Sequence, residues 1–164
     1  MPTISVDLGS GKAPRNPYNY DKVIGVEANE IGENIINCWI GLEPIPLEDS
    51  SVDAVTAYDF LEHLPRAIWK DGKMENAFIN TMNEAWRILK PGGLLLAVTP
   101  AYPAKEAFQD PTHVNIITEQ TIGYFTGRFN NIGRRYGFIG NFSQRINAVG
   151  KTHIKWELEA IKTT

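Results

Sequence analysis

The sequence predicts one α/β domain, with a mostly parallel sheet that an antiparallel hairpin closes at one edge. Three patterns predict it: short β-rich runs that are apolar on both faces, one stretch with a helical apolar stripe, and a final alternating stretch. Buried parallel strands are apolar on both faces, whereas half-exposed antiparallel strands alternate. Because 164 residues is the size of one domain, we assign residues 1–164 to a single one.

The parallel part of the sheet is expected from five short apolar runs. Each is rich in β-branched or aliphatic residues and too short for an independent helix. Their lengths suit strands that are buried between other layers. The runs are 4–8, 22–27, 35–40, 52–58 and 94–99.

One clear helix lies between the last two runs. From Glu75 to Leu89, apolar residues recur at spacings of three and four, which places them on one helical face. Lys90-Pro-Gly-Gly93 then ends the helix and turns the chain into the next strand. A second, shorter helix is expected from Thr118, as its N-cap, to Tyr124.

The end of the chain predicts the hairpin. Apolar and polar residues alternate from His153 to Ala160, with a period of two. We expect its partner strand over Phe142–Val149 and the turn at Gly150-Lys151. An antiparallel pair after alternating strands and helices belongs at the edge of an α/β sheet.

Composition excludes several classes of protein. The chain has one cysteine, Cys38, so it has no internal disulfide framework, and we place this residue in the core. The beginning of the chain lacks a basic segment followed by an apolar one, and no apolar run approaches the roughly 18 residues of a membrane span. We therefore expect a cytoplasmic protein that is not embedded in a membrane.

The loop after the first strand predicts a ligand site. Asp7-Leu-Gly9-Ser10-Gly11 offers glycines that let a ligand approach the backbone. Glu27 ends the second strand at the same edge of the sheet, where a carboxylate can accept hydrogen bonds from ribose hydroxyls. Pro14 stands where a dinucleotide fingerprint has its third glycine, and with Pro17 it prevents a regular helix that could hold a pyrophosphate. The pattern favours a cofactor that has a ribose but no phosphate.

Five motifs in register resemble the class I S-adenosylmethionine-dependent methyltransferases, in a compact form similar to the type 11 methyltransferases. They span about residues 4 to 100, and each is less specific than their common order and spacing. The resemblance implies a Rossmann-like three-layer domain with a seven-stranded, mostly parallel sheet and a reduced helix after strand one. The matching segments are Val6–Gly11, Glu27, Pro46–Val55, Phe60–Leu64 and Ala85–Gly93.

The resemblance also implies a cofactor, S-adenosylmethionine, and the residues that would bind it. Gly9, Ser10 and Gly11 would line its methionine part, and Asp7 would orient its amino group. Glu27 would bind both ribose hydroxyls. Three further residues would lie around the adenine: Ala28, Leu47 and Glu48.

For the reaction, the resemblance places Tyr58 and Asp59, just past the fourth strand, opposite the transferring methyl group. His113 follows the fifth strand at the carboxyl edge of the sheet, where loops often carry function, so it is a candidate base. His153 is expected to be merely exposed at the start of the last strand. No zinc or nucleophile pattern is present, and no metal is expected.

Charge bears on the methyl acceptor. The net charge is −3, yet residues 120–156 contain no acid and six basic residues, Arg128, Arg134, Arg135, Arg145, Lys151 and Lys155. Such a segment predicts a surface that faces an anion. Because the protein as a whole is acidic, we favour a small acceptor, anionic if this segment binds it. Two alternatives stay open: a nucleic-acid methyltransferase, and a non-catalytic protein that binds the cofactor. The oligomeric state is not predicted.

Overall fold

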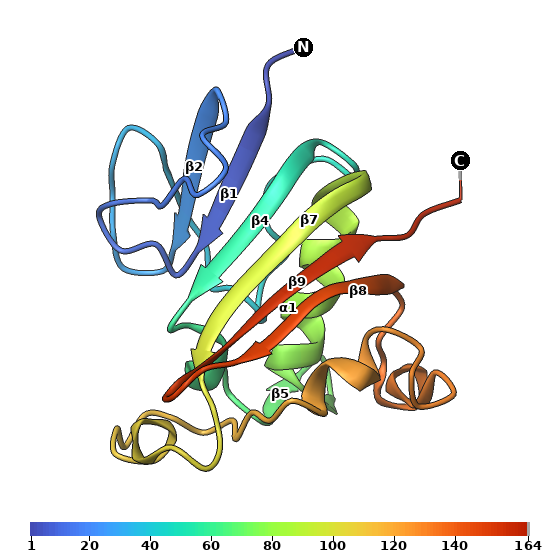
Figure 1. The fold of residues 1–164 in the computed structure, drawn as a ribbon. Coiled ribbons are helices and arrows are strands. Elements are labelled where there is room, and N and C mark those ends of the chain that lie inside the picture. Colours follow the sequence, from blue (N-terminus) through green and yellow to red (C-terminus); the bar gives the residue numbers. More distant parts are fainter. Residues whose placement is uncertain (164) are drawn as a thin grey trace.

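The structure, a computed structural model, describes residues 1–163. Its centre is a seven-stranded sheet in the order β3-β2-β1-β4-β7-β9-β8, drawn in Figure 1. The first five strands in this order are parallel, and β9 is antiparallel to both of its neighbours. The bounds are β1 Ile4–Leu8, β2 Lys22–Glu27, β3 Ile35–Asn37, β4 Val52–Tyr58, β7 Leu89–Pro100, β8 Phe142–Val149 and β9 His153–Ala160.

The predicted parallel sheet with its antiparallel edge is confirmed. Val6 of β1 pairs with Ile24 of β2 and Val55 of β4, and all three are buried. Ser5 and Asp7, on the opposite face of β1, are buried as well, so both faces of the strand are covered. In β9 the alternating residues Ile154, Trp156 and Leu158 have no exposed surface. The period of two in the sequence therefore marks the side of β9 that enters the core.

Helix α1, Ala77–Ile88, confirms the predicted helix and packs against one face of the sheet, behind it in Figure 1. Asn76 caps it, because its side-chain oxygen accepts a hydrogen bond from the amide of Ile79 at 3.0 Å. The chain passes from α1 directly into β7. This strand begins earlier than predicted because Leu89 already pairs with Val52 of β4.

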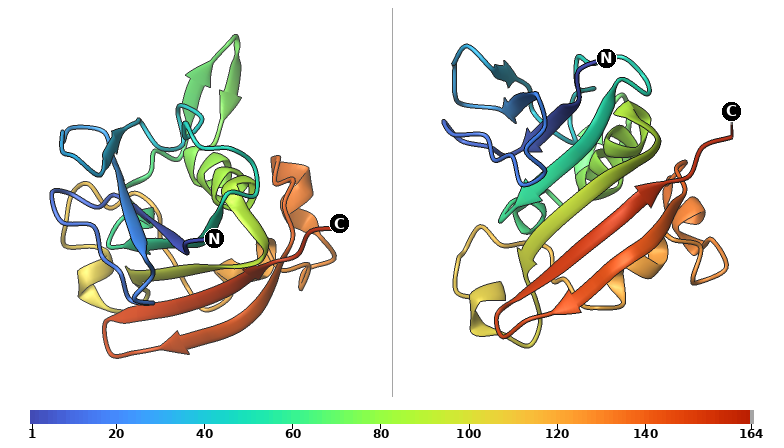
Figure 2. Two further views of the ribbon diagram at one scale, coloured as in Figure 1. Left: turned by 90° about the horizontal axis from the view of Figure 1, so that it is seen from above. Right: turned by 45° about the horizontal axis from the view of Figure 1, so that its top comes forward.

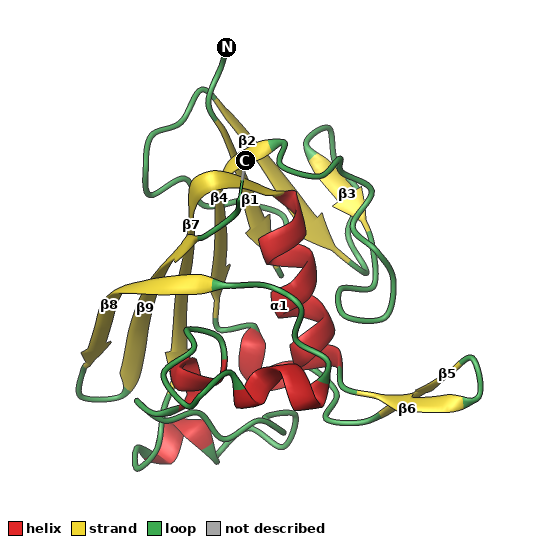
Figure 3. Ribbon diagram, turned by 90° about the vertical axis from the view of Figure 1, so that its right-hand side faces the viewer, coloured by secondary structure: helices red, strands yellow, loops and turns green. Residues whose placement is uncertain are grey.

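The second face of the sheet differs from the three-layer expectation. Among the described residues, α1 is the one α-helix, and the opposite face carries the loop 9–21 in place of a helical layer (Figure 3). The Tyr18 hydroxyl in this loop donates a hydrogen bond of 2.8 Å to Glu157 of β9. Pro14 and Pro17 explain the loop, since proline prevents continuous helix, and the expected reduction of this helix is confirmed.

Three local expectations need correction. Strand β3 ends at Asn37 and does not extend to residue 40. The short helix expected from Thr118 to Tyr124 is a 3-10 helix over Thr121–Tyr124. Its N-cap is Gln120 and not Thr118, and no side chain caps it; the Thr118 amide instead donates to the Thr121 hydroxyl at 3.0 Å. A separate hairpin, β5 Ile68–Lys70 and β6 Lys73–Glu75, was not predicted and projects beside α1 in Figure 2.

The other short 3-10 helices are η1 Leu61–His63, η2 Lys105–Ala107 and η4 Ile132–Tyr136, and the one over Thr121–Tyr124 is η3. Helix η1 follows β4 directly and therefore lies at the carboxyl edge of the sheet. Over residues 1–163, no helix is long and apolar enough to cross a membrane.

Candidate functional site

The glycine loop after β1 and the acid that ends β2 meet at the carboxyl edge of the sheet. Gly9 and Gly11 have φ of +65° and +55°, values that favour glycine. The Gly9 amide donates to the Val26 carbonyl at 2.9 Å. The Glu27 carboxylate accepts hydrogen bonds from the Gly11 amide at 3.3 Å and the Ala28 amide at 2.8 Å. The carboxylate thus lies beside the loop, as expected from the sequence.

A cavity of about 300 Å³ opens between this loop and the end of β4. Asp7 lies at its base with 2% of its surface exposed. Its carboxylate accepts hydrogen bonds from the Arg15 amide at 2.8 Å and the Thr56 hydroxyl at 2.6 Å. Burial raises the pKa of the Asp7 carboxyl above its usual value, although these hydrogen bonds oppose the rise. The lining residues are Asp7, Gly9, Ser10, Lys12, Ala13, Arg15 and Tyr58.

A raised carboxyl pKa predicts that Asp7→Asn stabilises the fold at neutral pH. Ionised Asp7 is a buried charge, and in the variant the Thr56 hydroxyl can donate to the Val6 carbonyl, which already lies 3.4 Å away. Because the folded state binds the Asp7 proton more tightly than the unfolded state does, wild-type stability rises as pH falls. Melting curves from pH 8 to pH 4 should show the variant melting higher at pH 8, with a gap that narrows toward acid. A gap that widens toward acid would contradict the burial argument.

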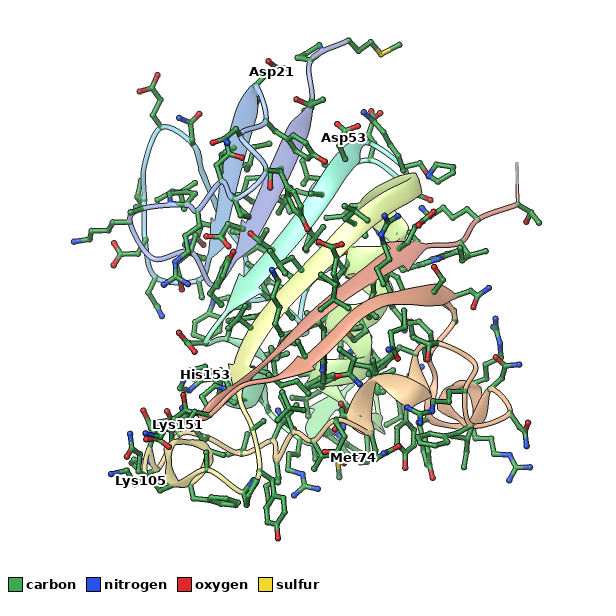
Figure 4. The ribbon with its side chains drawn as sticks, viewed as in Figure 1. Asp21, Asp53, Met74, Lys105, Lys151 and His153 are labelled. Carbon is green, nitrogen blue, oxygen red and sulfur yellow. The ribbon has the colours of Figure 1, made fainter. Side chains whose placement is uncertain are left out.

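Tyr58, the last residue of β4, lines this cavity, and Asp59 follows it in the chain. The Arg15 guanidinium lies over the Tyr58 ring, 4.4 Å from its centroid. Asp59 has a φ of +49°, and its carboxylate lies 3.0 Å from His153 Nε2. The expectation that His153 is merely exposed is wrong, because it pairs with the Asp59 carboxylate. Figure 4 shows His153 at the start of β9.

The side chain of His113 is 9% exposed. Its ring packs edge-on against His63, with centroids 4.7 Å apart, and Nε2 is 4.0 Å from Glu62 Oε1. It is not among the residues that line the cavity beside Gly9. The sequence placed His113 at the correct edge of the sheet, whereas its surroundings depend on the fold.

Leu47 and Glu48 lie away from this cavity. The Leu47 carbonyl accepts a hydrogen bond of 2.7 Å from Arg87, which is in the last turn of α1. That turn leads into the start of β7, at the amino edge of the sheet, so the structure does not bring these two residues to the glycine loop. On the carboxyl side of β3 the buried Cys38 comes first and Trp39 second, and the surface of Trp39 is 51% exposed.

Two residues of this region were not identified from the sequence. Arg15 enters the cavity from the proline-containing loop. Gly25 of β2 lets that loop pack on the sheet, since a Cβ there would lie 2.3 Å from Ser10 Oγ and 2.7 Å from Pro14 Cγ. The signal available in the sequence was a glycine in the middle of an otherwise β-branched strand.

In the basic segment of residues 120–156, two of the arginines already bind other groups of the chain. Arg134 donates to the carbonyls of Ile139 and Gly140, and Arg145 forms an ion pair of 2.7 Å with Glu159 of the neighbouring strand. Arg135 lines a larger cavity of about 920 Å³ between the start of α1, the β5–β6 hairpin and residues 115–137. That cavity shares no lining residue with the one beside Gly9.

A family profile described as a methyltransferase domain matches residues 7–97, which include the glycine loop, Glu27 and β4. The chain belongs to this methyltransferase family. Its reaction is the transfer of a methyl group, and its cofactor is S-adenosylmethionine. No curated protein matches the sequence closely enough to count as a relative.

Solved structures of methyltransferases share the fold. One from Aquifex aeolicus, described as S-adenosylmethionine-dependent, is 17% identical with a TM-score of 0.58, over 97% of this chain and 82% of the other. Phosphoethanolamine N-methyltransferase 1 of Haemonchus contortus is 12% identical with a TM-score of 0.62, over 98% and 39%. A Burkholderia thailandensis 1,6-didemethyltoxoflavin-N1-methyltransferase is 12% identical with a TM-score of 0.62, over 99% and 72%.

The residues at the carboxyl edge fit the cofactor of this methyltransferase. A Cβ on Gly11 would meet no atom within 4 Å, so the space above the loop is free for a ligand. Two carboxylates lie near the loop, that of Glu27 at the Gly11 amide and that of Asp7 in the cavity, and a carboxylate can accept hydrogen bonds from hydroxyl or ammonium groups. Arg15 also lines the cavity, and its guanidinium can donate hydrogen bonds to the carboxylate of a ligand.

Proposed function

We propose that this methyltransferase, acting as one domain over residues 1–164, methylates a small anionic molecule at the carboxyl edge of its sheet. The observation that carries the proposal is the cavity between the glycine loop and Tyr58, with Asp7 buried at its base. When bound, S-adenosylmethionine supplies a methyl group on a sulfonium centre. In-line transfer mainly requires alignment of the acceptor with that group, so the protein's part is to hold both partners.

The proposal assigns a task to each side chain at this edge. Gly9, Ser10 and Gly11 hold the methionine part, with Asp7 accepting from its ammonium group and Arg15 donating to its carboxylate. Glu27 accepts hydrogen bonds from the ribose. The adenine would lie between Ala28 and Trp39, since Asn37 already donates to the Ala28 carbonyl at 2.6 Å and brings the two segments together.

The acceptor would lie on the other side of Tyr58. Asp59 and His153 form a hydrogen-bonded pair there, which suits removal of a proton from an acceptor hydroxyl or amine. His113, the base candidate predicted from the sequence, stands behind them.

Cationic side chains at this end support an anionic acceptor. Figure 4 shows Lys105 and Lys151 at the same end of the molecule as His153. The Ala101 amide donates a hydrogen bond of 3.1 Å to the Thr152 carbonyl, which connects the segment after β7 to the start of β9. Two neighbours act on or contain small molecules by their descriptions, a phosphoethanolamine and a toxoflavin precursor, which also supports a small acceptor. Because Arg134 and Arg145 are occupied inside the chain, few arginines are left to neutralise a phosphate backbone.

The proposal is tested by following a labelled methyl group. The protein is incubated with tritiated S-adenosylmethionine and a cell extract, and the products are divided into acid-soluble and acid-precipitable fractions. We expect the label in small acid-soluble molecules that bind an anion-exchange resin. Boiled enzyme is the control for spontaneous methylation.

Label in RNA or DNA would contradict the proposal. So would nucleic-acid binding in an anisotropy titration whose affinity falls with salt on a log–log slope of several units, since each neutralised phosphate adds about 0.9. Label in neutral small molecules would support a small acceptor and contradict the proposal that this acceptor is anionic.

A further inference from the structure

A compact cluster of side chains of the types that bind metals lies just past the end of β4. Glu62 and His63 belong to η1, directly after β4, and His113 comes from the loop after β7. One potential ligand atom from each of the three lies within 4.8 Å of the other two. Two imidazoles and one carboxylate form a ligand set that divalent transition metals prefer.

The fold holds these residues together through the backbone. The Glu62 carbonyl accepts hydrogen bonds from the amides of Val114 and Asn115, at 2.9 Å and 3.1 Å. The Asn115 side chain also donates to the carbonyls of Leu61 and Leu64. These four bonds attach the His113 loop to η1, so the cluster is a built feature of this edge.

Glu62 is buried, and its two carboxylate oxygens differ in their hydrogen bonding. It is 1% exposed, and its Oε2 accepts a hydrogen bond of 2.8 Å from the Thr99 hydroxyl. Within residues 1–163, its Oε1 has no hydrogen-bond partner, and neither has His113 Nδ1. A buried carboxylate with an unpaired oxygen is unfavourable unless a cation compensates it. Oε1 points toward His113, with 4.0 Å between Oε1 and Nε2.

That distance is too long for a hydrogen bond and close to the spacing of two metal ligands. In a tetrahedral site with bonds near 2.1 Å, neighbouring ligand atoms stand about 3.4 Å apart. Small side-chain movements would therefore bring the atoms of the cluster into coordination distance.

Hydrogen bonds also set the protonation of His63. The Thr112 hydroxyl lies 2.6 Å from Asp110 Oδ1, to which it donates, because a carboxylate can only accept. It then accepts from His63 Nδ1 at 2.9 Å, which leaves Nε2 with a free lone pair. A ligand histidine fixed by a second partner on its other nitrogen is the usual arrangement around protein-bound metals.

We propose that Glu62, His63 and His113 bind one divalent transition-metal cation, of the series from Mn²⁺ to Zn²⁺. Thr99, which donates to Glu62, is next to Pro100, and Pro100 pairs with His153 in the sheet. The cation would therefore lie at the end of the sheet where the methyl acceptor binds, a placement that rests on the proposed function. There it would bind an acceptor oxygen and lower the pKa of its hydroxyl, with Asp59 and His153 positioned to take the proton. The sequence predicted no metal because His113 is far along the chain from Glu62 and His63, so the three residues do not form a short motif with the spacing of metal ligands.

The test measures metal binding by the complete chain. Protein freed of metal with a chelator is dialysed against Zn²⁺, Mn²⁺ or Co²⁺, and bound metal is measured by mass spectrometry. We expect one ion per chain. At a hundred times the Kd, we expect Tm to rise by about 5–10 °C. Bound Co²⁺ should show visible absorption bands of a site with nitrogen and oxygen ligands.

Two variants and one matched control assign the ligands. Glu62→Gln keeps the shape of the side chain and removes its charge, and His113→Gln removes an imidazole; each should weaken binding at least 100-fold. His153→Gln removes the third histidine of the chain, which is outside the cluster, and should leave the metal affinity unchanged. Tm values of the metal-free variants verify that they are folded.

Stoichiometric binding that both cluster variants lose supports the site. Absence of binding at 1 mM metal, a concentration of about a thousand times a micromolar Kd, overturns it, as does equal affinity in wild type and in folded Glu62→Gln. Calorimetry with S-adenosylhomocysteine separates the two proposals. If S-adenosylhomocysteine binds and no metal does, the metal site is rejected and the proposed function stands. If the metal binds and S-adenosylhomocysteine does not, the metal site stands and the proposed function is rejected.

Discussion

Glu27→Ala should weaken the binding of S-adenosylmethionine by roughly 30-fold or more. In the proposed complex the carboxylate accepts two charge-assisted hydrogen bonds from ribose, together about 2–4 kcal/mol. Its existing bonds to the amides of Gly11 and Ala28 show that it is already oriented toward the loop, so binding requires little reorganisation. Isothermal titration calorimetry with S-adenosylhomocysteine measures the loss.

Glu33→Ala is the matched control for this variant. Glu33 is an exposed carboxylate in the loop between β2 and β3, so its removal changes the net charge equally without touching the glycine loop. We expect its affinity to equal that of wild type. If folded Glu27→Ala also binds with wild-type affinity, Glu27 does not hold the ribose, and the assignment of the cofactor site at this edge fails.

Gly9→Ala should be among the most damaging single changes in the chain. At a φ of +65° a Cβ introduces strain of about 1–2 kcal/mol. The new Cβ would also lie 2.3 Å from Cδ2 and 2.7 Å from Cγ of Phe60, so the ring would have to move, at a further cost of about 1–3 kcal/mol. We expect Tm to fall by roughly 5–15 °C and cofactor binding to weaken with the displaced loop.

Gly11→Ala separates the two causes. Gly11 has a φ of +55°, and a Cβ there meets nothing within 4 Å, so the variant suffers only the backbone strain of about 1–2 kcal/mol. Thermal unfolding of both variants should show the larger loss for Gly9→Ala. Phe60→Leu in the Gly9→Ala background should recover part of it, because a smaller side chain leaves room. Equal losses in the two glycine variants would show that the contact with Phe60 does not matter.

The sheet could be predicted from the sequence because each strand has a recognisable pattern of apolar and polar residues within its own length. Residues 23–26 and 94–98 are apolar on both faces, and His153–Ala160 alternates, so burial can be inferred from neighbours in the sequence. The β5–β6 hairpin had a signal as well. Asp71-Gly72, both at positive φ, is a pair typical of tight hairpin turns.

The site was predictable only where its residues follow strands that lie side by side. The glycine loop and Glu27 end neighbouring strands, so their proximity follows from a parallel sheet. The pairing of Asp59 with His153 joins residues 94 positions apart, and it depends on β9 entering between β7 and β8. The contact of Glu62 with His113 depends on the path of an irregular loop, for which no periodic pattern exists.

The position of β9 has a consequence for how the protein is made. This strand lies inside the sheet, paired on both sides, yet it leaves the ribosome after both of its partners. Until it arrives, a nascent chain displays the long, largely apolar edge of β7 and a separate β8, both able to pair with strands of other chains. Such an interval of exposure is when a newly made chain is most prone to aggregate and most dependent on chaperones. Pairing of β9 with both β7 and β8 ends this exposure and completes the sheet.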